Sequence, residues 1–415
     1  MSQTSGQEGA DIVKIPITKP YFDNEEIGAV TSVLESGWVV QGPKVAEFER
    51  IIADFTKAKF ARATTSCTTA LHLALLSLGI GPGDSVLVPS FTYIASANAI
   101  EYTGAKPVFI DINPDTFNID PHKITDYLEK GETRRSNIKG IMPVHLFGLS
   151  ADMNPIMEIA RQYNLCVVED AACALGALYH DKHAGTFGNA GCFSFHPRKS
   201  ITTGEGGMVI TNNEEIATAI ESLRNHGATI SDLTRHEKAG FLLPEFNVLG
   251  YNYRMTDLQG AIGVEQMKKL THIIDKRIER AKIYDEQLKG IECLQLPSAP
   301  EGCKHVYQSY VAQIKNPTSK TLSLDVLTEI RNKIMVNLEE KDIATRQGTH
   351  AVHTLGYYKQ KYHLDCNDYP ASLAADRLSI TLPLYAQMTD GEQEYVIDNL
   401  VKITKTCFSE KVGNY

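Results

Sequence analysis

The chain has 415 residues, of which 43% are hydrophobic and 22% are charged, and its formal net charge is −9. This is an ordinary globular composition with enough apolar material for a large core, and the length predicts two or three domains. The acidic balance argues against nonspecific binding of nucleic acid, because contacts with phosphates need a basic face.

The eight cysteines are scattered, and none forms a C-x-x-C pair. Several lie in apolar runs, which favours reduced, mostly buried thiols in a cytoplasmic protein. The N-terminal stretch MSQTSGQEGADIVK is polar and has no apolar signal core. Because no uninterrupted apolar run reaches about 18 residues, we expect a soluble protein without a membrane segment.

Two helices are expected before residue 60. The stretch DNEEIGAVTSVLES (23–36) has helical spacing and an acidic start, and it ends at Gly37. The stretch EFERIIADFTKA (47–58) is the second helix. Residues 1–14, which precede both, are expected to form a flexible tail.

From residue 60 onward, short β-branched runs alternate with helical stretches. The expected strands are SVLVPS (85–90), KPVFIDI (106–112), IKGIMPVH (138–145), LCVVED (165–170), GCFSFH (191–196) and GGMVIT (206–211). Expected helices between several of them include TTALHLALLSLG (68–79) and MNPIMEIARQYN (153–164). Such alternation predicts an α/β domain with a mostly parallel central sheet.

Near residue 255 the pattern changes again. A long helix is expected over 256–290, beginning at a Thr-Asp cap. Beyond it, the pattern predicts strands at 309–314 and 378–384 and helices at 324–334 and 390–404. We therefore predict a large α/β domain over residues 15–260 and a smaller C-terminal α+β domain over residues 261–415, joined by the long helix.

One loop, SFHPRKSITTGEGG (194–207), holds a single lysine, Lys199, among threonines and glycines. A P-loop has its lysine after its glycines, and a Rossmann fingerprint follows a strand and has a different glycine spacing, so neither nucleotide motif fits. Taken alone, Lys199 is most simply a solvated lysine.

Two further segments offer polar groups at positions where α/β proteins bind ligands. The apolar strand LCVVED ends in Asp170, which faces such a crevice, although a lone aspartate there more often caps the next helix. A strong helix begins at a run of small residues, whose free N–H groups can bind an anion, although ordinary capping is commoner. This run consists of Ser66, Cys67, Thr68 and Thr69.

The combination of these segments matches the needs of pyridoxal 5′-phosphate (PLP). This cofactor needs a lysine for a Schiff base and an acid that pairs with its pyridinium nitrogen. Its flat ring takes an aromatic face, which Tyr93 in PSFTYIASANA offers. Its phosphate takes hydroxyls and backbone amides, such as those of the helix start.

With these segments the chain resembles the DegT/StrS-type sugar aminotransferases, which are PLP enzymes of the aspartate-aminotransferase fold (fold type I). The resemblance runs from ITKPYFDNEEI to LPLYAQMTDGEQEYV, nearly the whole chain. Its most specific segments are SCTTALHLALLSLGIGPGD, PSFTYIASANAI, VVEDAACALGA, FSFHPRKSITTGEGGM and GYNYRMTDLQGAIG.

The resemblance implies a role for each matching residue at the cofactor. Lys199 would form the Schiff base, and Asp170 would bind the pyridine nitrogen. Tyr93 would stack on the ring. The residues implied to hold the phosphate are Cys67, Thr68 and Ser194. The resemblance also implies a homodimer with shared active sites, in which Asn252 reaches the phosphate of the neighbouring subunit.

Two positions at the cofactor, Cys67 and Cys173, depart from the common pattern of the family. Many members have glycine where Cys67 stands, so its side chain must point away from the phosphate. Many have Gln or His where Cys173 stands, a position that touches the phenolic oxygen of the cofactor. A thiol donates only weakly, so this contact is expected to be missing here.

The expected substrate contacts lie elsewhere in the chain. Arg254 is the candidate for the carboxylate of the amino donor, with a structural ion pair as the alternative. His196 is a further candidate. Arg346, His350 and His353 in IATRQGTHAVHTLGYY are expected to contact substrate phosphate or sugar. The H-A-V-H spacing lacks a third ligand, so no metal site is expected.

The resemblance thus implies transfer of an amino group from an amino acid, with L-glutamate the expected donor, to a keto sugar carried on a nucleotide, with ping-pong kinetics. One alternative is transamination of a cyclitol or a free keto sugar. A second is sugar dehydration, for which a relative has histidine in place of the lysine. A third is a non-catalytic regulator, which the presence of both Lys199 and Asp170 disfavours.

Overall fold

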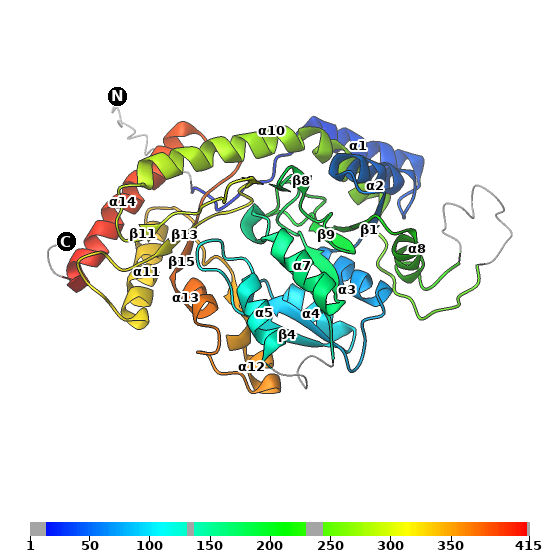
Figure 1. The fold of residues 1–415 in the computed structure, drawn as a ribbon. Helices are drawn as coiled ribbons and strands as arrows, with labels where there is room; N and C mark the ends of the chain where they lie inside the picture. The colour runs from blue at the N-terminus through cyan, green and yellow to red at the C-terminus, as the bar shows by residue number, and fades with distance from the viewer. Residues whose placement is uncertain (1–13, 131–136, 230–243, 413–415) are drawn as a thin grey trace, which may run out of the picture.

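The computed structural model describes residues 14–130, 137–229 and 244–412. The predicted tail over 1–14 therefore lies, apart from Lys14, outside the described residues. In Figure 1 the long helix α10 (Asp257–Leu288) runs along one side of the molecule, from helices α1 (Asn24–Ser36) and α2 (Pro43–Thr56) to the C-terminal helix α14 (Asp390–Val412).

A seven-stranded sheet forms the centre of the large α/β part. Its strands are, in spatial order, β1 (Phe60–Thr64), β10 (Gly207–Thr211), β9 (Ala190–Ser194), β6 (Cys166–Asp170), β5 (Ile138–Ile141), β2 (Ser85–Pro89) and β4 (Lys106–Ile110). Neighbouring strands from β9 to β4 are parallel, and β10 alone runs antiparallel to both of its neighbours. The predicted α/β fold with a mostly parallel sheet is confirmed.

The remaining strands form three small sheets. They are β11 (Leu294–Gln295), β13 (Tyr310–Ile314) and β15 (Ser379–Leu382); β12 (Cys303–Lys304), β7 (Leu178–Tyr179) and β8 (Lys182–His183); and β14 (His350–Ala351) with β3 (Phe91–Thr92). The other helices are α3 (Cys67–Ser77), α4 (Ala95–Tyr102), α5 (Pro121–Glu129), α7 (Met153–Tyr163), α8 (Glu214–Leu223), α11 (Leu324–Glu339), α12 (Gly356–Tyr362) and α13 (Pro370–Leu378). Among the described residues, no helix combines the length and apolarity that a membrane crossing requires.

Strand direction gathers polar groups at one edge of the central sheet. Parallel strands present their carboxyl ends at a common edge, where α/β proteins bind ligands. Asp170 ends β6 at this edge. The strand register brings Gly207, Thr64 and Ser194 to the same edge, because Gly207 pairs with Thr64 on one side and with Ser194 on the other.

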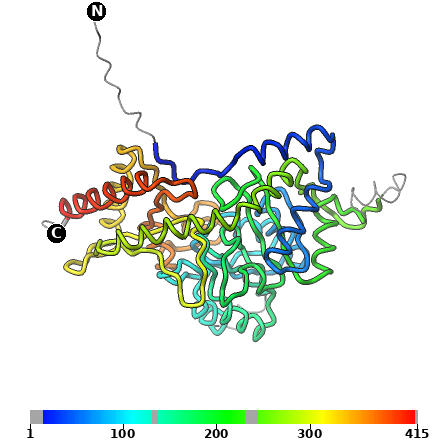
Figure 2. The backbone as a smooth tube through the Cα atoms, turned by 90° about the horizontal axis from the view of Figure 1, so that it is seen from above, coloured from blue at the N-terminus to red at the C-terminus, as the bar shows by residue number. Residues whose placement is uncertain are grey.

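Helix α10 joins two hydrophobic clusters. It begins at the predicted cap, where Thr256 and Gln259 form a reciprocal capping box. Its first half packs against the large sheet through residues such as Met267, and its last turns pack through Tyr284 against the C-terminal strands and helices. Figure 2 shows α10 passing from the N-terminal part of the fold to the C-terminal part.

Two short segments pack across the domain division that the sequence predicts at residue 260. Ile15 bridges to Ile343 and is buried in the C-terminal cluster. Val352 and Tyr358 belong instead to a buried cluster of the large part, where the hydroxyl of Tyr358 donates to the side chain of Asn98 on α4 at 2.6 Å. The assignment of residues 15–260 and 261–415 to two domains stays a prediction.

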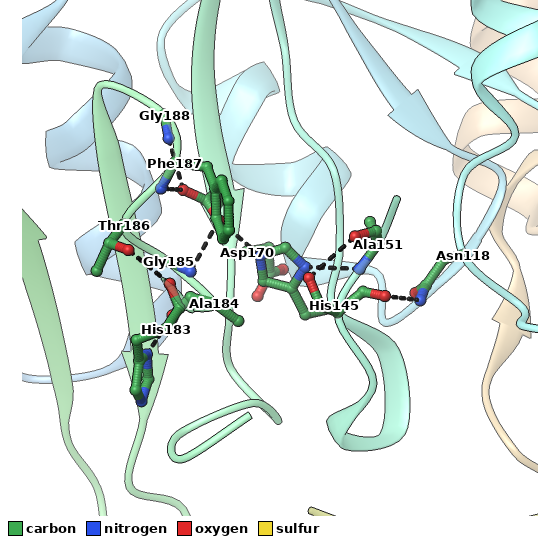
Figure 3. Close-up of polar contacts among 12 residues, drawn as sticks. Asn118, His145, Ala151, Asp170, His183, Ala184, Gly185, Thr186, Phe187 and Gly188 are labelled. Carbon is green, nitrogen blue, oxygen red and sulfur yellow. Dashed lines mark hydrogen bonds and ion pairs between the residues drawn. The ribbon is translucent and has the colours of Figure 1, made fainter. Parts of the chain in front are cut away.

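A buried carboxylate fixes the end of strand β6. Glu169 is fully buried, and its two oxygens accept hydrogen bonds from the backbone amides of Gly185, Phe187 and Gly188, each at 2.7 Å. His145 Nε2 lies 2.8 Å from the same carboxylate. Because His145 Nδ1 accepts from the amide of Ala151, a neutral ring donates from Nε2 (Figure 3).

We predict that Glu169→Ala lowers the free energy of unfolding by about 3–5 kcal/mol, because it leaves two buried and two partly buried donors without their acceptor. Urea unfolding followed by circular dichroism measures this loss. The control is Asp54→Ala, which removes an exposed ion pair with Arg50 and should cost close to nothing. Equal losses in the two variants would contradict the anchoring role of Glu169.

Candidate active site

Lys199 lies in the loop that connects β9 to β10, and backbone hydrogen bonds hold this loop. The amide of Lys199 donates to the carbonyl of His196 at 2.8 Å, and the amide of Phe195 donates to Gly206 at 2.9 Å. The Nζ atom of Lys199 donates to Sγ of Cys173 at 3.1 Å. The predicted neighbours Lys199 and Cys173 are therefore in direct contact.

The pKa of Lys199 is raised above its ordinary value in the cofactor-free chain. Burial acts in the other direction and lowers this pKa, but Cys173, Cys67 and Asp170 together outweigh it. Burial raises the pKa of Cys67 well above its usual value, so this thiol is neutral. The Lys199 amine thus contacts the thiol of Cys173, and its charge interacts with Cys67 on α3 and Asp170 on β6.

Asp170 is held in place by two donors. Its Oδ2 atom accepts from the hydroxyl of Ser96 at 2.7 Å, and its Oδ1 atom accepts from the amide of Ala172 at 3.1 Å. The hydroxyl of Thr92 lies 3.0 Å from that of Ser96 and extends the chain of hydrogen bonds. Asp170 is only 5% exposed, so its carboxylate is oriented before any ligand binds.

The start of helix α3 offers backbone amides at the same edge of the sheet. Ser66 and Thr69 cap the helix reciprocally, so their hydroxyls serve the capping box. Cys67 and Thr68 occupy the first turn, where amides point out of the helix. The side chain of Cys67 is buried in the cluster that contains Val168. That it points away from a bound phosphate stays a prediction.

A close approach of backbones joins the helix start to the lysine loop. A Cβ atom on Gly207 would lie 2.3 Å from the carbonyl of Ser66 and 2.6 Å from the amide nitrogen of Cys67. Only glycine fits there. Since Gly207 pairs with Ser194, the predicted phosphate residues on β9 and α3 are brought to one place.

These groups fit the cofactor that the resemblance implies. PLP would be held by the amine of Lys199, by the oriented carboxylate of Asp170 at its ring nitrogen, and by the α3 amides with Ser194 at its phosphate. The aromatic candidate Tyr93 directly follows β3, and its side chain is 65% exposed, so one face is open to a ligand.

Three of the predicted substrate residues lie on segments near Tyr93, the small sheet and Lys199. His350 is exposed and pairs with Thr92, which places it beside Tyr93. Arg346 forms a backbone bridge with Thr381 at the edge of the small sheet. His196 lies within the lysine loop, where its Nδ1 accepts from the amide of Arg198 at 3.2 Å and burial lowers its pKa.

His353 does not fit the substrate contact that the sequence predicts. Its side chain is fully buried, and both ring nitrogens have partners, the hydroxyl of Ser90 and the carbonyl of Cys366. Burial also lowers its pKa. The ring is a neutral part of the core that ties the segment after β14 to the end of β2, which removes it from the surface of the site.

Asn252 and Arg254 lie on the segment that precedes α10. Asn252 is exposed and forms a backbone bridge with Asn225. The Nη1 atom of Arg254 donates to the side-chain oxygen of the same Asn225. Arg254 thus has a neutral hydrogen-bond partner, and both of its predicted roles, contact with the donor carboxylate and a structural ion pair, stay predictions. Among the described residues, no group of His, Cys, Asp and Glu side chains could hold a metal ion.

Two residues that shape the site, Ser96 and Gly207, are not among the residues predicted from the sequence. Ser96 lies 74 positions before Asp170 in the chain and orients its carboxylate. It belongs to the segment PSFTYIASANA, in which only Tyr93 is a predicted site residue. Gly207 is required by the close approach described above. A glycine that begins a β-strand was the available signal, because glycine weakens a strand unless another backbone comes near.

The chain matches known proteins over nearly its whole length. The model of the DegT/DnrJ/EryC1/StrS aminotransferase family matches residues 20–401. GDP-perosamine synthase of Caulobacter vibrioides is 37% identical over 396 residues, which cover 95% of this chain and 99% of that protein. The spore coat polysaccharide biosynthesis protein SpsC of Bacillus subtilis is 37% identical over 391 residues, covering 94% and 97%.

A solved structure agrees with this match. The PLP form of Spr1654 from Streptococcus pneumoniae superposes with a TM-score of 0.85 at 27% sequence identity, covering 95% of this chain and 99% of that one. Fold, cofactor and reaction class are therefore shared. The chain is a PLP-dependent aminotransferase that belongs to the DegT/DnrJ/EryC1/StrS aminotransferase family.

Proposed function

We propose that the enzyme moves the amino group of L-glutamate to the keto group of a nucleotide-linked sugar, in two half-reactions at one site. The observation that carries this proposal is the meeting of Lys199, Cys173 and Asp170 at one edge of the sheet, with the amine 3.1 Å from the thiol. The similarity to a GDP-perosamine synthase supports a sugar nucleotide as the acceptor and a place in amino sugar biosynthesis.

When bound, PLP supplies an electron sink for the negative charge that develops at the donor Cα. Asp170, whose carboxylate is held at the strand end by Ser96 and Ala172, would supply the negative charge that keeps the ring nitrogen protonated. Lys199 first holds the cofactor and then moves a proton to and from the reacting carbon atoms. Its raised pKa in the cofactor-free chain means that the amine becomes a base only after this environment changes.

The residues at the rim would contact the substrates. Tyr93 would lie on the ring, His350 beside it would contact the sugar, and Arg346 would contact a phosphate. The lysine distinguishes this reaction from sugar dehydration, in which a relative carries histidine at position 199. Transamination of a ketone without a nucleotide is the second candidate, and the choice between them depends on whether the rim binds phosphate.

A two-step assay tests the proposal. Purified PLP-loaded enzyme should convert glutamate to 2-oxoglutarate in an amount equal to its active sites, with loss of the yellow colour, before any acceptor is added. Adding keto-sugar nucleotides should then restore the colour and yield an amino sugar detectable by mass. Lys199→Ala should do neither, because it has no amine to hold the cofactor or to move the proton.

The controls separate the possible failures. Free keto sugars and cyclitols, tested in the second step, would replace nucleotide sugars as acceptors if the second candidate is right. Absence of the glutamate step in PLP-loaded enzyme, or full activity of Lys199→Ala, would contradict the proposed mechanism.

We also propose that two chains form a homodimer in which Asn252 reaches the cofactor phosphate of its partner. An apolar, exposed stretch lies just before this residue. Phe246 is 60% exposed, Val248 51% and Leu249 86%. Contiguous exposed apolar residues mark interaction surfaces, and this stretch joins Asn252 to such a surface.

Mixing two inactive variants tests the shared site. If Asn252 acts across the interface, Lys199→Ala and Asn252→Ala are each inactive alone. A mixed dimer then contains one complete site, built from Lys199 of one chain and Asn252 of the other. Refolding the two variants together should therefore restore up to about a quarter of the wild-type activity, since half of the dimers are mixed and each has one of two sites.

Leu249→Gln should impair this restoration, because it weakens the proposed interface, while Asp54→Ala should not. No restoration in the mixed sample, with dimers demonstrated by sedimentation, would show that Asn252 acts within its own chain.

A further inference from the structure

Arg198 directly precedes the active-site lysine, and its backbone is fixed on both sides. Its amide donates to Nδ1 of His196, and its carbonyl accepts from Nε2 of Gln308 at 2.6 Å. Gln308 is a buried residue just before strand β13. The lysine loop is therefore tied to the small C-terminal sheet at the position of Arg198.

Arg346 is attached to the same small sheet. Its backbone pairs with Thr381 on β15, and Thr381 pairs in turn with Val311 on β13. Val311 lies three positions after Gln308 in the chain. The backbones of the two arginines are therefore attached to the same small sheet, Arg198 next to β13 and Arg346 on β15.

Electrostatics agree with this placement. Partial burial lowers the pKa of Arg198, the charge of Arg346 lowers it further, and Tyr93 acts in the opposite direction. The charges of Arg346 and Tyr93 thus both act on Arg198, and the segment that follows Arg346 reaches the same place, because His350 pairs with Thr92 next to Tyr93. Tyr93 is the residue expected on the cofactor ring, so the two cations adjoin the place where a substrate would lie.

Neither guanidinium has an acidic partner within the part of the chain that the structure describes. Both residues are exposed, so a ligand that arrives from solvent can reach their guanidinium groups. Two neighbouring cations without counter-ions repel each other, and a bound anion with two charges would relieve that repulsion. Guanidinium groups also match phosphate oxygens in geometry.

We propose that Arg198 and Arg346 together clamp a phosphate or diphosphate group of the sugar substrate. This role rests on the proposed function and adds Arg198 as a residue that determines specificity. A carboxylate is the other oxyanion in the reaction, as in glutamate. We favour phosphate because a carboxylate has one charge, whereas a diphosphate can neutralise both guanidinium groups at once.

Pyrophosphate binding tests the clamp without catalysis. Calorimetry on the PLP-loaded enzyme, reduced with borohydride, should detect pyrophosphate binding that weakens as salt rises. Arg198→Gln and Arg346→Gln should each weaken it about tenfold or more, the effect of losing one charged hydrogen bond. The control Arg50→Gln makes the same change of charge at an exposed position of α2, and this variant should bind pyrophosphate as the wild type does.

A second measurement separates the two sources of oxyanion. The clamp predicts that Arg198→Gln still converts glutamate to 2-oxoglutarate at close to the wild-type rate in the first half-reaction. Unchanged pyrophosphate affinity in Arg198→Gln would overturn the proposal. So would a glutamate step slowed tenfold or more with pyrophosphate affinity intact, since the arginine would then serve the donor. Because neither readout needs a sugar acceptor, failure here is distinct from failure to aminate a nucleotide sugar.

Discussion

Two neighbouring carboxylates at the end of strand β6 set the geometry on which the site depends. Successive side chains of a strand point to opposite faces, so Glu169 and Asp170 serve different purposes. Glu169 turns into the protein and accepts from three backbone amides and from His145. Asp170 turns toward the lysine loop, where Ser96 orients it. Glu169 fixes the end of strand β6, and the end of this strand in turn positions Asp170, which would meet the cofactor.

The other parts of the site are positioned by backbone rather than by side chains. Gly207 lets the lysine loop and the start of α3 approach within contact distance. The same glycine pairs with Ser194, so one residue aligns the amine of Lys199 with amides that can receive a phosphate. Little rearrangement is then needed when a ligand with a ring nitrogen at one end and a phosphate at the other is bound, which is how preorganisation lowers the cost of binding.

Much of this fold could be predicted from the sequence, because its strands are continuous apolar runs and its long helix has a clear cap. Asp170 and the start of α3 are candidates because they lie at a strand end and a helix start. Lys199 lies in a loop and becomes a candidate only through its combination with the other segments and the resemblance to the family. Side-chain partners far apart in sequence could not. Ser96 has no feature of its own that marks it as the partner of Asp170, and His353 looks like a surface ligand until its burial is known.

The central claim is that Lys199 carries the cofactor at the edge defined by Asp170. Borohydride reduction of the PLP-loaded enzyme makes this link permanent, and peptide mapping by mass spectrometry then locates it. The account predicts a single modified peptide that contains residues 194–207, with the added mass on Lys199. Modification of another lysine, or none in enzyme that demonstrably contains PLP, would contradict the account.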